Sequence, residues 1–206
     1  MSSQSRQITG WLLVIAAVLS VAGTILGLVI PGPSGSNGPP SNIVSLVNLS
    51  AGILILVSLP MAYREQKPQI GILGLIGVIC LWLAFALFNV VLHLASLVAV
   101  SSNHASALAS NPYLPVLFIG VILLQIIGSV VFGLGVIRAR VFSALIGWLL
   151  LASALMVILD FPLSGTSEMI VQILSDVLLS LSLGWLGFAI ASRAAKTATL
   201  PAGIAK

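Results

Sequence analysis

The sequence predicts an all-α membrane protein, a bundle of six transmembrane helices with both termini in the cytoplasm. The first observation behind this is composition: 59% of the 206 residues are apolar and only 6% are charged, whereas a soluble domain carries about 25% charged residues. The second is that six apolar stretches are long enough to cross a hydrocarbon core, which needs roughly 20 helical residues. The third is that every Lys and Arg falls at ends of these stretches that would face one side of the membrane.

The same composition excludes an ordinary soluble enzyme, a disordered chain and a fibrous repeat. A membrane β-barrel is excluded because the apolar stretches do not alternate polar with apolar residues. The lone Cys80 rules out an intramolecular disulfide and cysteine-based zinc or dithiol redox chemistry within one chain. We therefore expect one integral membrane domain over residues 1–206.

The first span carries no charge and is longer than the 7–15 apolar residues of a signal peptide, so we expect it to be retained. The third span is the longest and would measure about 46 Å as a helix. Because its outer end carries Ser96, Ser101 and Ser102, we expect that end to project beyond the lipid rather than the helix to tilt. Taken in order, the predicted spans cover residues 11–30, 43–63, 70–100, 114–137, 142–161 and 168–190.

Loop composition supports these boundaries. The loops at residues 31–40, 101–112 and 161–166 are rich in Pro, Gly, Ser and Asn and contain no Lys or Arg. By the positive-inside rule they face outward, and the basic loops face the cytoplasm. The basic residues are Arg6, then Arg64 and Lys67, then Arg138 and Arg140, then Arg193, Lys196 and Lys206.

Polar side chains inside spans are costly and rarely face lipid, so their positions are the best guide to function. Residues spaced by four share one helical face. Most of the helical faces on which polar residues gather in this way fall in the outer half of the membrane. This predicts an outward-opening polar pocket built from every span except the fourth, whose apolar outer half, residues 114–124, suggests a peripheral, lipid-facing helix. The candidate pocket residues are Asp176, His93, Asn89, Gln172, Asp160, Glu168 and Asn48.

Asp176 is the most informative of these residues, because it lies about 25 Å along the helix from Arg193 and no Lys or Arg lies at its depth. Three interpretations stay open. The first is a neutral or hydrated carboxyl near the interface, the second a proton or cation site, and the third a catalytic acid.

His93 has a similar set of interpretations. It either sits among lipid headgroups or pairs with Asp160, Asp176 or Glu168. A metal site is the third alternative, but the sequence has no HxxxH or HExxH spacing to support it.

Small residues in the first span indicate helix packing. Gly23 and Gly27 are four residues apart, with Ser20 on the same face. This small-xxx-small pattern predicts a close contact with another helix.

One further pattern is a weak resemblance. Residues 132–138 form a Gly-rich helix end that closes with Arg138, and Gly147 and Trp148 then open the next span. The arrangement resembles small uncharacterised bacterial membrane proteins with six spans. The resemblance implies a six-helix protein of the bacterial inner membrane, and it implies no functional residue.

Function is predicted mainly from missing motifs. The sequence has no phosphate-binding loop, nucleophile elbow, haem ligand pair or interrupted transporter helices, and we predict no cofactor, no metal and no nucleic-acid partner. The first interpretation is a non-enzymatic accessory or scaffold subunit, with the lipid bilayer and other membrane subunits or a second copy of itself as partners. The alternative is a small carrier or binding protein for a cation, a proton-coupled solute or a lipid headgroup. Convergence of Asp176, His93 and Asn48 on one cavity would favour the alternative.

Overall fold

The computed structural model describes residues 3–30, 41–102, 110–160, 162, 163 and 165–199, without the side chains of 67, 68 and 196–199. Gly35, His104 and Lys206, which mark predicted outer and inner segments, lie outside the described residues. The described chain is helical throughout, so the all-α prediction is confirmed. The helices are α1 (Ser3–Val29), α2 (Asn42–Phe85), the π-helix η1 (Ala86–Leu92), α3 (His93–Ser101), α5 (Leu114–Ala139), α6 (Ala144–Asp160) and α7 (Thr166–Thr199).

Five helical segments are long and apolar enough to cross a membrane. Helix α2 supplies the whole of one of them and the first part of the next, because it folds back on itself near Gly71. That glycine has φ 65° and ψ −156°, a conformation that side chains with a Cβ rarely adopt, and the Tyr63 hydroxyl donates a hydrogen bond to its carbonyl at 3.2 Å. The five segments are Ser3–Val29, Asn42–Gln66, Gln69–Ser101, Leu114–Ala139 and Thr166–Ala195.

Helix α6 is shorter than the predicted 20-residue span. It has 17 residues, about 25 Å of helix. The chain turns at Arg140, where φ is 51°, and the Ser143 hydroxyl accepts a hydrogen bond from the Leu145 amide at 3.3 Å. Such serine caps start helices, so α6 begins at Ala144 rather than at Phe142.

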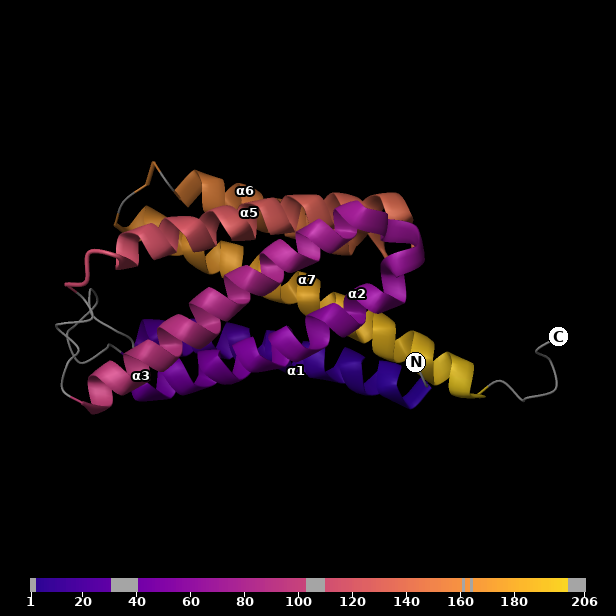
Figure 1. The fold of residues 1–206 in the computed structure, drawn as a ribbon, viewed down its shortest axis with the longest axis horizontal. Helices are drawn as coiled ribbons and strands as arrows, with labels where there is room; N and C mark the ends of the chain where they lie inside the picture. Colours follow the sequence, from indigo (N-terminus) through magenta and orange to yellow (C-terminus); the bar gives the residue numbers. More distant parts are fainter. Residues whose placement is uncertain (1–2, 31–40, 103–109, 161, 164, 200–206) are drawn as a thin grey trace.

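The long third segment, Gln69–Ser101, combines the end of α2 with η1 and α3. It runs obliquely across the bundle in Figure 1. An oblique course accommodates a helix that is too long for the bilayer. This course favours the tilted alternative, and the projection of the outer end beyond the lipid stays a prediction.

The bundle has six helical segments, called legs here: α1, Asn42–Gln66, Gln69–Ser101, α5, α6 and α7. These legs form a closed ring in chain order. The extensive contacts join α1 to α2, α2 to α5, α5 to α6 and α6 to α7, and α1 to α7 closes the ring. The expectation that the fourth span is peripheral is wrong, because α5 packs along both α2 and α6.

Glycines bring neighbouring legs close together. A Cβ on Gly187 of α7 would lie 2.5 Å from the Gly10 carbonyl oxygen of α1, and a Cβ on Gly147 of α6 would lie 2.5 Å from the Gly133 carbonyl oxygen of α5. Membrane helices use small residues in this way because lipid offers no hydrophobic drive for helix association.

One end of the bundle carries the described arginines, Arg6, Arg64, Arg138, Arg140 and Arg193, and is called the basic end here. The N-terminus of α1 and the C-terminus of α7 both lie there (Figure 1). Across it, the Arg6 Nε lies 3.1 Å from the Glu65 Oε2. The guanidinium of Arg193 donates a hydrogen bond to the Val141 carbonyl oxygen and lies 4.5 Å from the Phe142 ring centre.

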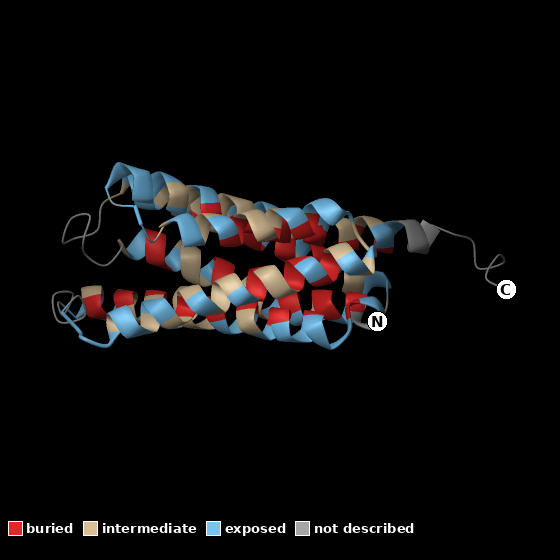
Figure 2. Cartoon of the chain, turned by 90° about the horizontal axis from the view of Figure 1, so that it is seen from above, coloured by how far each residue is buried: buried red, intermediate tan, exposed pale blue. Residues whose placement is uncertain are grey.

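The buried residues lie on the inside of the ring of helices. Figure 2 shows buried residues on the inward faces of the helices and exposed residues on the outward faces. The outward faces carry many large apolar side chains, as expected of a surface in lipid. Inside the half nearer the basic end, bulky side chains fill the ring, among them Leu13, Leu59, Phe132, Leu150, Leu183 and Leu186.

Candidate functional site

The half of the bundle away from the basic end holds a cavity of about 440 Å³. Here α1 and α7 carry small and polar residues instead of bulky ones, so the ring is not filled. Leu81, Phe85 and Leu179 belong both to the apolar core and to the cavity wall, and so separate the cavity from the basic end. Every leg of the ring contributes to the lining.

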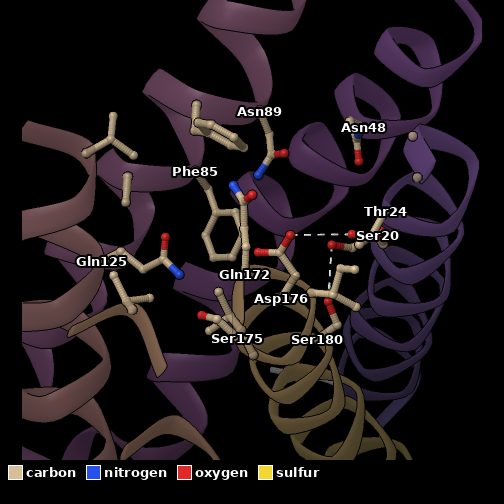
Figure 3. Close-up of a pocket in the computed structure, with 18 of the residues that line it drawn as sticks. Ser20, Thr24, Asn48, Phe85, Asn89, Gln125, Gln172, Ser175, Asp176 and Ser180 are labelled. Atoms are coloured by element: carbon tan, nitrogen blue, oxygen red, sulfur yellow. Dashed lines mark hydrogen bonds between the residues drawn. The ribbon is translucent and has the colours of Figure 1, made fainter. Parts of the chain in front are cut away.

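Asp176 on α7 lies at the polar side of the cavity. Its Oδ2 accepts a hydrogen bond from the Thr24 hydroxyl of α1 at 3.5 Å. One turn further along α7, the Ser180 hydroxyl donates to the Ser20 hydroxyl at 3.1 Å (Figure 3). Both bonds connect α1 to α7, so the helix pair that closes the ring also positions the carboxylate.

Asn48 and His93 approach the level of Asp176 from α2 and α3. A Cβ on Gly23, the residue before Thr24, would collide with the Asn48 amide group, which places Asn48 beside α1 at that level. Asn89 packs against Gly52, one turn along α2 from Asn48. Since these two legs are antiparallel, one turn from Asn89 in the other direction brings His93 level with Asn48.

Asn89 belongs to the π-helix η1. A π-turn holds one more residue than an α-turn and often occurs at functional sites. The residues in and around it, Phe85, Phe88, Asn89 and His93, all line the cavity. The local widening of this helix therefore coincides with the cavity wall.

The side formed by η1 and α5 is aromatic. The Phe88 ring packs edge-to-face against His93 at 5.7 Å and against Phe118 of α5 at 5.9 Å. His93 is only 6% exposed, and neither of its ring nitrogens has a hydrogen-bond partner among the described residues. Buried polar groups are rarely left unpaired, so this imidazole on the cavity wall lacks a partner that such groups normally have.

The remaining candidate pocket residues, Asp160, Gln172 and Glu168, lie on α6 and α7 at the end of the bundle away from the basic end. Asp160, the last residue of α6, lines the cavity, and its buried Oδ1 has no partner in the described part of the chain. Gln172 is exposed and also lines the cavity, whereas Glu168 is an exposed first-turn residue of α7 outside the lining. The structure thus brings together six of the seven predicted pocket residues and leaves Glu168 apart.

The predicted packing residues of α1 also face the cavity. Gly23 makes the close contact with Asn48, and Ser20 bonds across to α7. Gly27 has more room, because a Cβ there would lie 3.8 Å from the nearest Val44 atom. Another helix therefore approaches α1 closely at Gly23 but not at Gly27.

Sequence reasoning missed several lining residues. Gln125 of α5 lines the cavity, although the fourth span was expected to take no part in the pocket. The aromatic residues Phe85, Phe88 and Phe118 were missed because a phenylalanine in an apolar span looks the same whether it faces lipid or a cavity. The polarity of Gln125 was the one available signal.

In Figure 3 the labelled amides and carboxylate point into one space between the helices. Among the described residues that line it, none is Lys or Arg, whereas two, Asp160 and Asp176, are carboxylic acids. Within the described residues, no group of three or more His, Cys, Asp or Glu side chains is arranged to hold a metal ion.

Comparison with known proteins adds no relative: no family model, no curated protein and no solved structure matches this chain.

Proposed function

We propose that this protein is a membrane protein that binds a small positively charged solute in the cavity beside Asp176. One observation carries the proposal: Asp176, His93 and Asn48, from three different legs, line one cavity. Divergent side chains would instead have favoured a scaffold without a ligand site.

The charge of the cavity favours a cation. Asp176 and Asp160 supply the formal negative charge, and no lining residue supplies a Lys or Arg to neutralise it. A carboxylate in a partly dehydrated site is costly unless an opposite charge or hydrogen bonds accompany it. The single bond from Thr24, at 3.5 Å, leaves most of that requirement to the solute.

We further propose six spans, with the basic end in the cytoplasm of a bacterial inner membrane. The gathering of the described arginines at that end supports this orientation by the positive-inside rule. The more exposed lining residues, such as Leu28, Phe118 and Met169, belong to the opposite ends of their helices. The solute therefore enters from the outer side of the membrane.

The experiment compares two matched carboxylate-to-amide changes on α7, with the purified protein in nanodiscs of zwitterionic lipid. Asp176→Asn removes the charge inside the cavity, and Glu168→Gln makes the same change outside the lining. A panel of small inorganic and organic cations is titrated calorimetrically. At least tenfold weaker binding in Asp176→Asn but not in Glu168→Gln is expected, and equal affinities in all three proteins would contradict the proposal.

An accessory or scaffold role stays a prediction. The exposed Ile, Leu, Val and Phe side chains on the outward faces suit lipid and a partner helix equally well. Native purification in mild detergent tests it, because a subunit should co-purify with a stoichiometric partner. A monodisperse monomer with no partner would count against that role.

A further inference from the structure

We infer that the cation is an organic ammonium ion with an apolar or aromatic substituent, its charged group beside Asp176 and its substituent against Phe85, Phe88 and Phe118. This inference rests on the proposed function and deepens it by naming the class of solute. It follows from the size of the cavity, the chemistry of its two sides and the unpaired imidazole of His93.

Size is the first argument. A cavity of about 440 Å³ lies in the range of about 300–1,000 Å³ that is typical of small-molecule sites. An inorganic ion would leave most of this space to water. Much of the lining is hydrocarbon, including Leu28, Val44, Ile122, Val157 and Met169, and water gains little from such walls. A solute with a carbon skeleton fills the space better.

The two sides of the cavity differ in chemistry. The α1 and α7 side presents Asp176 with the hydroxyls of Thr24, Ser20 and Ser180. The η1 and α5 side presents the edge-to-face rings of His93, Phe88 and Phe118. Aromatic faces attract ammonium groups and also pack against their apolar substituents, so one solute satisfies both sides.

An ammonium fits better than a guanidinium. A guanidinium binds a carboxylate best through two parallel hydrogen bonds, which need both carboxylate oxygens. In Asp176 one lone pair of Oδ2 already accepts the Thr24 hydroxyl, which restricts the directions from which two parallel hydrogen bonds can reach the carboxylate. An ammonium acts as a point charge and needs no such pair of parallel bonds.

His93 is a second, independent indication of a ligand. It is more than nine-tenths buried, it lines the cavity and neither ring nitrogen is paired in the described part of the chain. A solute or a water carried with it supplies the missing partner. The imidazole therefore marks the aromatic side as a place where a bound molecule is expected.

The test uses benzyltrimethylammonium, tetramethylammonium, benzylguanidine, Na⁺ and K⁺ as probes, titrated calorimetrically into the full-length protein in zwitterionic nanodiscs. Benzyltrimethylammonium should bind at least tenfold more tightly than each of the other four. Phe118→Leu should weaken benzyltrimethylammonium binding about three- to tenfold, because the benzyl group loses an aromatic contact, and should weaken tetramethylammonium binding less. The matched control Phe188→Leu changes an exposed ring on the outward face of α7 and should change neither affinity.

The outcomes separate this inference from the proposed function. Binding of Na⁺, K⁺ or tetramethylammonium that depends on Asp176, with no advantage for the benzyl compound, overturns the inference and leaves the proposed function standing. Tighter binding of benzylguanidine overturns the assignment of an ammonium group. Absence of any Asp176-dependent cation binding overturns both. The ranking of probes on the unmodified protein decides the matter even if a variant fails to fold.

Discussion

Asn89 lies directly against Gly52: a Cβ added to that glycine would sit 2.5 Å from the Asn89 Cβ. The contact joins the two antiparallel legs that meet at the Gly71 turn, and Asn89 occupies the middle of η1. Because Gly52 has no side chain, the π-helical turn that contains Asn89 can pack directly against this part of α2.

Gly52→Ala should destabilise the protein. The added methyl group must displace Asn89, and overpacking of this kind costs about 1–3 kcal/mol. Unfolding in detergent, followed by circular dichroism against denaturant, measures the loss. Gly120→Ala is the control, because a Cβ there meets nothing within 4 Å and alanine is the better helix former. Equal stability of the two variants would contradict the described contact.

Gly71→Ala tests the turn between the second and third legs. A Cβ at Gly71 also meets nothing within 4 Å, so any loss comes from the backbone conformation at φ 65°. That strain costs about 1–3 kcal/mol. The same unfolding assay applies, with Gly27→Ala as the comparison, because no positive φ is found at Gly27. A Gly71→Ala protein as stable as the parent would show that the turn takes another shape.

Binding of an ammonium ion should weaken as the pH falls. Protons compete with the solute for the Asp176 carboxylate, and protonation of Asp160 or His93, the other titratable groups in the lining, acts in the same direction. Affinity for benzyltrimethylammonium is measured between about pH 5 and 8, where carboxyl groups in cavities titrate. Asp176→Asn should flatten most of this dependence. Identical pH profiles of the two proteins would argue that Asp176 has only a structural role.

The orientation is tested by reporter fusions along the chain. Fusions at Arg6, Lys67, Arg140 and Lys206 should report the cytoplasm, and fusions near Gly35, His104 and Gly165 the outer side. The reason is the location of the basic residues. One inner loop that reports outside would reverse the depth of Asp176 and remove the argument for entry from the outer side.

Hydropathy and loop composition located the helices well, because lipid rewards long apolar runs and Pro or Gly interrupts them. The four-residue spacing on α7 placed Glu168, Gln172, Asp176 and Ser180 on one face, and all of them except Glu168 line the cavity. Periodicity identifies a face in this way because a polar side chain in lipid carries a large penalty.

What could not be predicted is the arrangement of apolar surfaces. Helix α5 was expected at the periphery because residues 114–124 are apolar. In a membrane both the lipid-facing and the packed side of a helix are apolar, so hydropathy offers no contrast between them. Neither the contact of Gly128 with Leu81 of α2 nor the three phenylalanines of the cavity left a distinct signal.

The π-helix η1 has a consequence for how this site changes between related sequences. Because a π-turn holds one residue more than an α-turn, every residue beyond it lies one helical position, roughly 100° and about 1.5 Å, behind its place in an uninterrupted α-helix. Deletion of one residue such as Val90 would turn His93 and Ser96 to a different side while Leu81 and Phe85 kept their places. The outer wall of the cavity is thus exchangeable by a single insertion or deletion, with no substitution in the wall itself and no change in the fold beneath it.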